Sequence, residues 1–447
     1  MRGLKNFAAA AVLAFAAAAA SSACAETVAV TNARVLTMGP AGEIQNGTVV
    51  IRDGKIVAVG AGVAAPAGAR VIDAQGQIVT PGFVIADSAL GAMEVTSVGD
   101  DLSPNTPGLT AAFDVQYGLN PDSFLLPVAR LGGITRAVVV PAYGGGGDGG
   151  HEHDTAGAYG HDVPKSLFAG QAAVVDLGQH DDMLTKARVA MTAPMGEMGA
   201  RAAGGARGAE FVLLKTALDD VRFYMANKAA FDTGSARELN LSRADLEALI
   251  PVVEGRMPLL VSVHRASDIR QALRFAKQQN LKLIIDGGEE AWKVADQIAA
   301  AGVPVILNPL ADLPGNFETL GSTMENAGVL EKAGVTVVIK ANEENAHRAR
   351  EARFNAGNAV AHGMSYAGAL KALTINPAKV FGVADRFGSL EAGKDADLVI
   401  WSGDPLEPLS QPQAVFVKGE QMPLTSRALQ LRDRYKSAGA MPPAYSK

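Results

Sequence analysis

Cysteine is nearly absent from this sequence. The 447 residues contain one cysteine, Cys24, which lies in the apolar N-terminal segment. A chain with a single thiol has no internal disulfide framework. If the segment ending at Ala25 is removed, the mature chain has no cysteine at all, which excludes both a thiol nucleophile and thiolate metal ligands.

A concentrated basic region is also missing. The chain has 40 Lys and Arg against 46 Asp and Glu, a formal net charge of −6, and the basic residues are scattered. Nucleic-acid binding requires a basic face, so we predict no nucleic-acid partner. No G-x-S-x-G elbow occurs, and the glycine run 144–147 lacks the G-K-[ST] of a phosphate-binding loop.

The N-terminus has the pattern of an export signal. Arg2 and Lys5 precede an apolar stretch over residues 7–20, and Ala23-Cys24-Ala25 supplies small residues for signal-peptidase cleavage. We expect a signal peptide over residues 1–25, cleaved after Ala25, and a periplasmic protein without a membrane span, because a span needs about 20 apolar residues. A lipoprotein anchored through Cys24 is the less favoured alternative, because Ser21 stands where such sites usually have an aliphatic residue.

Both ends of the chain are rich in short β-patterns. Valine and isoleucine dominate residues 28–38, 48–51, 55–60, 69–73 and 77–81. Asp53-Gly54 predicts a tight hairpin between two of these segments. The pattern returns in residues 397–401 and 413–418, so we predict one small β-domain assembled from both ends.

The middle of the chain alternates between strand and helix patterns. Strand-like segments are predicted at residues 137–141, 259–263, 281–285, 303–307 and 335–339. Helical spacing occurs in residues 269–279, 291–301 and 346–362, and Ser242 predicts the start of a further short helix. This alternation favours a parallel α/β barrel.

Several segments together resemble the amidohydrolase superfamily, in particular its imidazolonepropionase-like branch. They cover nearly the whole mature chain in order: GQIVTPGF at 76–83, GIT at 133–135, RASDI at 265–269, EAWKVAD at 290–296, TINPA at 374–378 and GSLEAGKDADL at 388–398. The resemblance implies a TIM-type (β/α)₈ barrel over residues 81–384. It also implies a composite β-sandwich from residues 26–80 plus 385–425, and it leaves 426–447 as a C-terminal tail.

The resemblance also implies a chemistry. Relatives hydrolyse non-peptide C–N bonds, such as those of cyclic amides, with one or two divalent ions that lower the pKa of a bound water, while an Asp moves the proton. Their ligands converge at the C-terminal mouth of the barrel. The first-strand His-x-His pair of such proteins falls here on Asp87-Ser88-Ala89, so Asp87 keeps a donor atom and Ala89 has none.

The other ligand positions are replaced as well. The fifth-strand histidine falls on Ser262, and His264 points to the same side two residues later. His264 is either a substitute ligand or a packed, hydrogen-bonded histidine, and we favour the second. The sixth-strand histidine falls on Gly287, next to Asp286. We therefore predict a barrel-mouth pocket of Asp87, Ser262, His264, Asp286 and Gly287 with a degenerate metal site.

Two further groups are weaker candidates for chemistry. The eighth-strand proton shuttle of the family falls within Asn342, Glu343 and Glu344, which offer a glutamate instead of an aspartate. A glycine-rich loop carries a metal-binding composition, with His151, His153, Asp154 and His161, but we favour a solvated loop because no rigid element fixes these side chains.

Three functions stay open. The first is a C–N hydrolase with substitute ligands, in which a divalent metal such as zinc binds only through those ligands. The second is a non-catalytic protein that binds a small molecule or pairs with an active homologue or with itself. The third is a metal-binding protein that uses the loop histidines.

Overall fold

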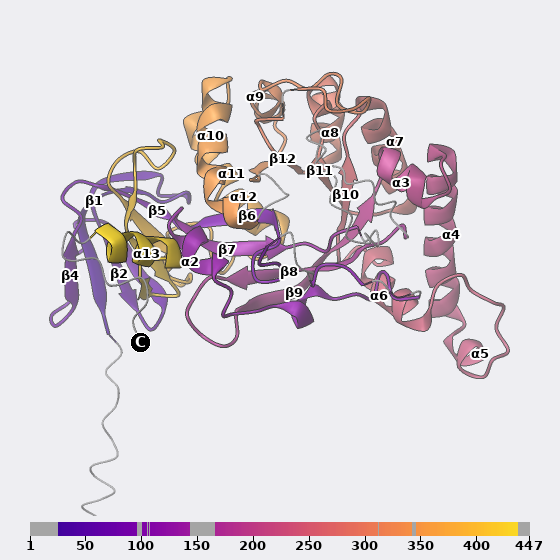
Figure 1. Ribbon diagram of the computed structural model, residues 1–447, viewed down its shortest axis with the longest axis horizontal. Coiled ribbons are helices and arrows are strands. Elements are labelled where there is room, and N and C mark those ends of the chain that lie inside the picture. The colour runs from indigo at the N-terminus through magenta and orange to yellow at the C-terminus, as the bar shows by residue number, and fades with distance from the viewer. Residues whose placement is uncertain are drawn as a thin grey trace, which may run out of the picture.

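The computed structural model describes residues 26–95, 101–104, 106, 108–143, 166–311, 313–341 and 346–436 (Figure 1). The segment 1–25, where we predict the signal peptide, lies outside the described residues. Within these ranges, no helix combines the length and apolarity needed to cross a membrane.

Sheet A joins strands from both ends of the chain. Its order is β16-β15-β14-β5-β1-β2-β3, and β4 pairs with β1. Figure 1 shows the indigo N-terminal strands beside the yellow C-terminal ones. The bounds are β1 Val28–Leu36, β2 Glu43–Arg52, β3 Lys55–Ala61, β4 Arg70–Asp73, β5 Ile78–Pro81, β14 Leu398–Trp401, β15 Pro412–Val417 and β16 Glu420–Met422. The division of the chain into a sandwich and a barrel domain stays a prediction.

The hairpin predicted at Asp53-Gly54 is confirmed. Strands β2 and β3 pair antiparallel across it, with Arg52 opposite Lys55. Asp53 and Gly54 both have positive φ, 51° and 72°, which a two-residue turn between twisted strands requires.

Sheet B forms a nearly closed barrel of eight strands in sequence order. Strand β13 approaches β6, so the two edges of the sheet meet. The bounds are β6 Phe83–Ser88, β7 Ile134–Val139, β8 Gly170–Asp176, β9 Leu184–Pro194, β10 Leu259–Val263, β11 Leu283–Gly287, β12 Val305–Leu307 and β13 Val337–Ile339.

The expectation of a wholly parallel barrel is wrong at one strand. Strand β8 runs antiparallel to both β7 and β9, while the other neighbouring pairs from β9 to β13 are parallel, as are β6 and β7. Only residues 177–183 separate β8 from β9. A parallel pair needs a crossover of a dozen or more residues, so this short connection permits only an antiparallel neighbour.

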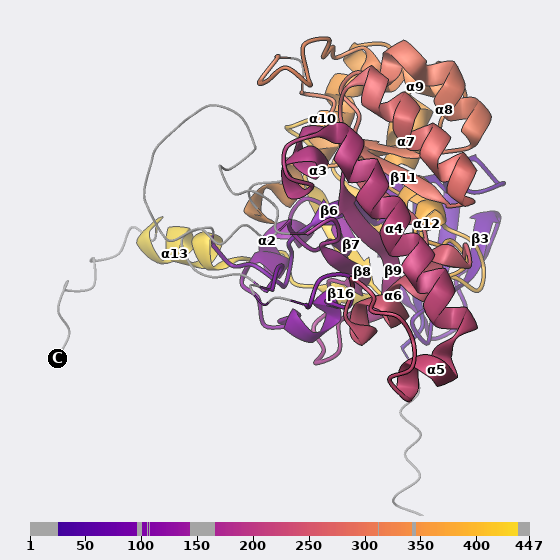
Figure 2. The ribbon, with the colours of Figure 1, turned by 90° about the vertical axis from the view of Figure 1, so that its right-hand side faces the viewer.

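Helices cover the outside of the barrel, and Figure 2 shows α4, α7 and α8 side by side on one flank. The α-helices are α2 Leu125–Arg130, α3 Gly196–Ala202, α4 Arg207–Ala226, α5 Lys228–Asp232, α6 Arg243–Val253, α7 Ala266–Gln279, α8 Ala295–Ala301, α9 Asn326–Lys332, α10 Ala352–Ala361, α11 Tyr366–Ala372, α12 Ile375–Val380 and α13 Arg427–Lys436. Short 3₁₀ helices are η1 Val115–Gly118, η2 Ala291–Val294 and η3 Ala346–Glu351.

Local sequence signals account for several of these helices. Ser242 caps α6 as predicted, because its hydroxyl accepts a hydrogen bond from the backbone N–H of Asp245. Helix α7 buries Ile269, Ala272 and Ala276 at helical spacing against the barrel, so its apolar face fixes the direction in which the chain leaves β10.

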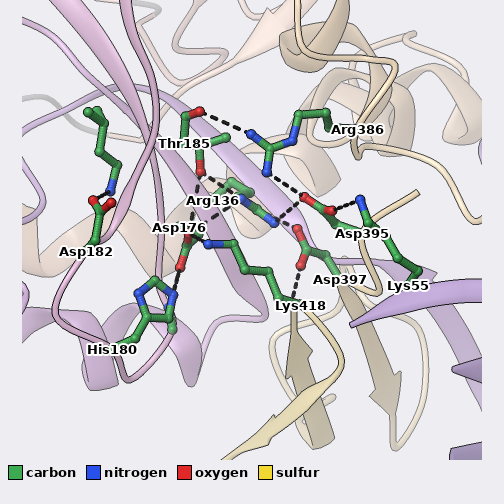
Figure 3. Close-up of polar contacts among 12 residues, drawn as sticks. Lys55, Arg136, Asp176, His180, Asp182, Thr185, Arg386, Asp395, Asp397 and Lys418 are labelled. Carbon is green, nitrogen blue, oxygen red and sulfur yellow. Dashed lines mark hydrogen bonds and ion pairs between the residues drawn. The ribbon is translucent and has the colours of Figure 1, made fainter. Parts of the chain in front are cut away.

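A buried charge network connects sheet A to the barrel (Figure 3). The Arg136 guanidinium on β7 is fully buried, and its Nε donates to Asp397 at 2.5 Å while its second terminal nitrogen donates to Asp395 at 3.0 Å. Asp176, at the end of β8, lies 3.6 Å from the same guanidinium and pairs with Lys418 at 2.5 Å. The strands of the two sheets are therefore held by complementary charges as well as by apolar packing.

Candidate active site at the barrel mouth

Side-chain alternation places the polar residues of the mouth inside the barrel. Leu260, Ile284 and Val338 belong to the apolar cluster that fills the barrel interior. Side chains two residues apart on a strand share a face, so Ser262, Asp286 and Lys340 continue the same inward rows toward the C-terminal ends. The register between β10 and β11 sets Ser262 directly beside Asp286.

Asp87 reaches the mouth through an irregular strand end. The pairing of β6 with β7 shifts register between Ile85 and Ser88, and Asp87 adopts a left-handed backbone with φ of 52°. Aspartate tolerates this conformation better than most residues. The irregularity turns the Asp87 carboxylate toward the mouth, where it meets Lys340.

Lys340 is the central charge of the site. Its side chain is only 2% exposed, and its Nζ donates at 2.8 Å to Asp87 Oδ2 and at 2.8 Å to Asp286 Oδ1. The backbone is fixed on both sides, since the Lys340 N–H donates to the Leu307 carbonyl and Asn355 donates to the Lys340 carbonyl. The ammonium therefore joins carboxylates from the first and sixth barrel strands.

The two carboxylates and the ammonium are strongly coupled. Burial, followed by repulsion from Asp87, raises the pKa of Asp286 to about 6, although Lys340 opposes the rise. Burial alone would lower the pKa of Lys340, but the charges of Asp286 and Asp87 raise it above its usual value. Lys340 is therefore a permanent cation, whereas Asp286 changes charge near neutral pH.

Tyr143 adds a neutral hydroxyl to the mouth. It follows β7 and makes a hydrogen bond with the Ser262 backbone. Burial, reinforced by the charges of Asp286 and Asp87, raises the pKa of the phenol well above its ordinary value. Tyr143 thus stays protonated and can donate a hydrogen bond to a bound molecule.

A second chain of hydrogen bonds crosses the mouth beside the first. His264 Nδ1 lies 2.5 Å from Glu289 Oε2, and His264 Nε2 lies 3.3 Å from Ser262 Oγ. Burial would lower the pKa of His264, but the Glu289 carboxylate more than offsets this and raises it. His264 is thus buried and hydrogen-bonded to Glu289 and Ser262, and these contacts are those of a packed, hydrogen-bonded histidine.

Gly287 gives His264 its space. A Cβ at Gly287 would lie 2.5 Å from His264 Nδ1, and Gly287 has φ of 89°. The imidazole from β10 therefore fills the volume that a side chain on β11 would occupy. A histidine at position 287 and the observed position of His264 exclude each other.

An outer layer of charge surrounds this centre. Arg207 donates to Glu318 at 2.7 Å and to Asp268 at 3.1 Å. Beneath them Glu210 is fully buried, and burial, followed by repulsion from Asp268, raises its pKa to about 8, although Arg207 opposes the rise. Glu210 is therefore mainly protonated at neutral pH.

The donor atoms of the mouth do not fit the metal pair that the resemblance implies. Among the described residues, no three His, Cys, Asp or Glu side chains gather closely enough to hold an ion. Both carboxylates that face each other are already bonded to an ammonium, and the Nδ1 of the imidazole is bonded to Glu289. Because a cation already occupies the place between the carboxylates, a divalent ion there would be repelled.

The structure brings together the five predicted pocket residues Asp87, Ser262, His264, Asp286 and Gly287. The weaker candidates Asn342, Glu343 and Glu344 lie outside the described residues, as do His151, His153, Asp154 and His161 of the loop. Sequence reasoning missed Lys340, Tyr143 and Glu289. One available signal was Lys340 itself, a charged residue directly after the strand-like segment 335–339.

Comparisons with known proteins show a similarity to amidohydrolases. Residues 310–423 match the model of the amidohydrolase family. An amidohydrolase from Thermotoga maritima MSB8 has a similar structure, with 27% identity and a TM-score of 0.75 over 90% of this chain and 100% of that one.

Curated relatives are similar over short segments. A 5'-deoxyadenosine deaminase of Methanosarcina mazei is 43% identical over 76 residues, which cover 17% of each chain. Amidohydrolase tasK of Hapsidospora irregularis is 40% identical over 58 residues, 13% of this chain and 6% of that protein. The chain thus matches well under two thirds of the length of either relative.

Proposed function

We propose that this chain is a member of the amidohydrolase superfamily, in its imidazolonepropionase-like branch, whose barrel mouth works without a divalent metal. The family match over residues 310–423 and the likeness to the Thermotoga maritima amidohydrolase over 90% of this chain support membership. The family activity, hydrolysis of non-peptide C–N bonds, defines the class of small, carbonyl-containing molecule that the mouth binds.

The observation that carries the proposal is the position of Lys340. Its buried ammonium joins Asp87 and Asp286, the first of which falls at a family ligand position and the second beside one. One fixed positive charge takes the place of a dissociable cation. Unlike a zinc ion, an ammonium has no open coordination position, so it cannot bind a water and lower its pKa.

The remaining groups suit the binding of a polar ligand. Lys340 supplies positive charge, Tyr143 supplies a hydroxyl donor, and Asp286 has a pKa of about 6, so it is a proton donor or acceptor near neutral pH. A carbonyl group that enters the mouth finds the Tyr143 hydroxyl as a donor.

Metal content and hydrolysis measured together test the proposal. Purified full-length protein would be incubated with Zn²⁺ or Mn²⁺, desalted, and analysed for bound metal, with and without a chelator. The proposal expects far less than one ion per chain and no loss of any activity toward small cyclic amides on chelation. Stoichiometric metal whose removal abolishes hydrolysis would overturn it.

A loop variant separates the barrel mouth from the glycine-rich loop. Replacement of His151, His153 and His161 by alanine removes any metal held by that loop. If metal were found in the unchanged protein, its survival in this variant and its loss in Asp87→Ala would locate it at the barrel mouth and contradict the proposal.

We further propose that the protein is exported to a periplasm after cleavage behind Ala25. The charged, apolar and small-residue order of residues 1–25 supports this. N-terminal sequencing of protein from a fractionated host tests it: a mature chain that begins at Glu26 in the periplasmic fraction is expected, and an uncleaved cytoplasmic chain would contradict it.

A further inference from the structure

Ser262, His264 and Glu289 form a hydrogen-bonded row at the barrel mouth. Ser262 and His264 lie on one face at the end of β10, and Glu289 follows β11. The distances are 3.3 Å from Ser262 Oγ to His264 Nε2 and 2.5 Å from His264 Nδ1 to Glu289 Oε2. Hydroxyl, imidazole and carboxylate therefore stand in the order that activates a serine nucleophile.

Glu289 determines how the imidazole is oriented. Glu289 is only 15% exposed, and the neighbouring imidazole lowers its pKa in spite of burial, so it is a carboxylate that accepts a hydrogen bond from the Nδ1–H of His264. In the neutral imidazole, Nε2 then has its lone pair directed at Ser262 Oγ. A base in this tautomer takes the hydroxyl proton, as in the triads of unrelated hydrolases.

The backbone around the row is fixed by hydrogen bonds to neighbouring segments. The Ser262 carbonyl accepts from Met195, the Val263 carbonyl accepts from Gly288, and the His264 carbonyl accepts from Glu290. Gly287 leaves room for the ring, as its Cβ would lie 2.5 Å from Nδ1. Such support holds a serine and its base at reacting distance.

Ser262 has an acidic neighbour on β11 and a hydroxyl neighbour that follows β7. Ser262 pairs in register with Asp286, and the Asp286 carboxylate holds the Lys340 ammonium at 2.8 Å. Tyr143 makes a hydrogen bond with the Ser262 backbone and keeps its proton. Tyr143 therefore offers a hydroxyl donor to an oxyanion that forms beside Ser262, and the Lys340 ammonium balances the charge of the neighbouring Asp286.

We infer that the barrel mouth carries a serine-dependent acyl hydrolase activity in which Ser262 is the nucleophile, His264 the base and Glu289 the residue that positions the imidazole. The inference rests on the proposed function, because it requires the mouth to be free of metal. The substrate class is a small ester or activated amide. No G-x-S-x-G elbow is involved, since the residues around Ser262 read LVSVH.

The reaction balances without any co-reactant except water. Ser262 Oγ forms a bond to the acyl carbon while its proton passes to His264 Nε2. The bond from the acyl carbon to the leaving oxygen or nitrogen then breaks, and His264 returns the proton to that atom. Water attacks the acyl-serine by the same route, which releases the acid and restores the serine.

A fluorophosphonate probe tests the nucleophile directly. The serine oxygen displaces fluoride from phosphorus, and intact-mass spectrometry with peptide mapping locates the adduct. The unchanged protein, kept in chelator, is expected to gain one phosphonyl group at Ser262, and Ser262→Ala is expected to gain none. Ser267→Ala is the matched control, because Ser267 is an exposed serine five residues away on α7, and it should label like the unchanged protein.

Hydrolysis of p-nitrophenyl acetate provides the second readout. Ser262→Ala should lose at least 100-fold in kcat, and Glu289→Gln should lose at least 10-fold in kcat with KM little changed, because Glu289 does not touch the ester. Asp296→Asn, an exposed carboxylate on α8, should leave both constants unchanged. Thermal melts confirm that each variant is folded.

The outcomes separate this inference from the proposed function. A protein that binds no metal and gains no adduct at Ser262 overturns the serine mechanism and leaves the proposed function standing. Stoichiometric metal at the mouth overturns both. An adduct at any serine other than Ser262, with activity kept in Ser262→Ala, also overturns the serine mechanism.

Discussion

At the scale of single residues, the mouth depends on charges that have been removed from water. Lys340 is buried, and the two carboxylates that it contacts come from distant points of the chain. Burying an ion costs several kcal/mol unless opposite charges surround it closely. The burial of each charge in this cluster is therefore offset by the opposite charges of its partners.

Replacing Lys340 by methionine should destabilise the fold. The substitution keeps much of the side-chain volume but leaves Asp87 and Asp286 facing each other without a cation, which should cost about 3–5 kcal/mol of unfolding free energy at pH 8. Urea unfolding measures the loss. Lys371→Met, at an exposed lysine of α11, should change stability by less than about 0.5 kcal/mol. Equal effects in the two variants would refute the bridging role of Lys340.

Glu210 should make stability depend on pH. Its folded pKa of about 8 lies above the ordinary 4.5, so the folded state binds a proton that the unfolded state has lost. Stability should therefore fall as pH rises from about 4.5 through about 8, by on the order of 5 kcal/mol. The variant Glu210→Gln keeps the charged neighbours Asp268, Glu318 and Arg207. Its free energy of unfolding, measured by urea at several pH values, should therefore depend less on pH. An identical profile in both proteins would contradict the assignment.

The sequence located some site residues but not their partners. The order of the family-like segments placed Asp87, Ser262, His264, Asp286 and Gly287 at strand ends, and strand alternation explains why most of them lie at the barrel mouth. Lys340, Tyr143 and Glu289 were missed because their roles depend on pairing across strands that are remote in sequence. Such pairings follow from the barrel's register, which one sequence does not specify.

At the scale of elements, the ends of the barrel strands, together with Gly287, determine which side chains lie at the mouth. Strands β10 and β11 pair in register, so a change in either one alters both rows of side chains. The predicted segments for β10 and for the Asp53-Gly54 hairpin agree with the structure because local patterns determine them. The direction of β8 was not predicted, because it depends on a short connection rather than on an apolar pattern.

Gly287→Ala should displace His264. The new Cβ would meet the imidazole at 2.5 Å, in addition to the strain of φ at 89°. Gly302→Ala is the matched control, since Gly302 has φ of 65° but open space around it. We expect the free energy of unfolding of Gly287→Ala to be about 1–3 kcal/mol lower than that of the control. In an NMR pH titration, His264 should also lose the raised pKa that Glu289 gives it. Equal stability and an unshifted His264 would disprove the steric argument.

At the scale of the whole molecule, a buried charge network centred on Arg136 helps to hold the two sheets together. Arg136 on β7 contacts Asp395 and Asp397 next to β14, and Lys418 after β15 contacts Asp176 of the barrel (Figure 3). The mouth lies at the strands' C-terminal ends, whereas this network connects the barrel to sheet A. Loss of this network should therefore lower the stability of the fold more than it changes activity at the barrel mouth.

Arg136→Met should destabilise the whole fold by about 3–5 kcal/mol, because it leaves buried carboxylates without their shared cation. Differential scanning calorimetry would follow the change. Arg256→Met, which removes an exposed arginine paired with Glu254, should be nearly neutral. A melting temperature as high as that of the control would show that the network contributes little.

The most direct test of the central claim is a crystal of the full-length protein soaked in zinc and measured at the zinc absorption edge. The account predicts density for the Lys340 ammonium between Asp87 and Asp286, with no anomalous peak among them. A strong anomalous peak at that position, with Lys340 turned away, would contradict it.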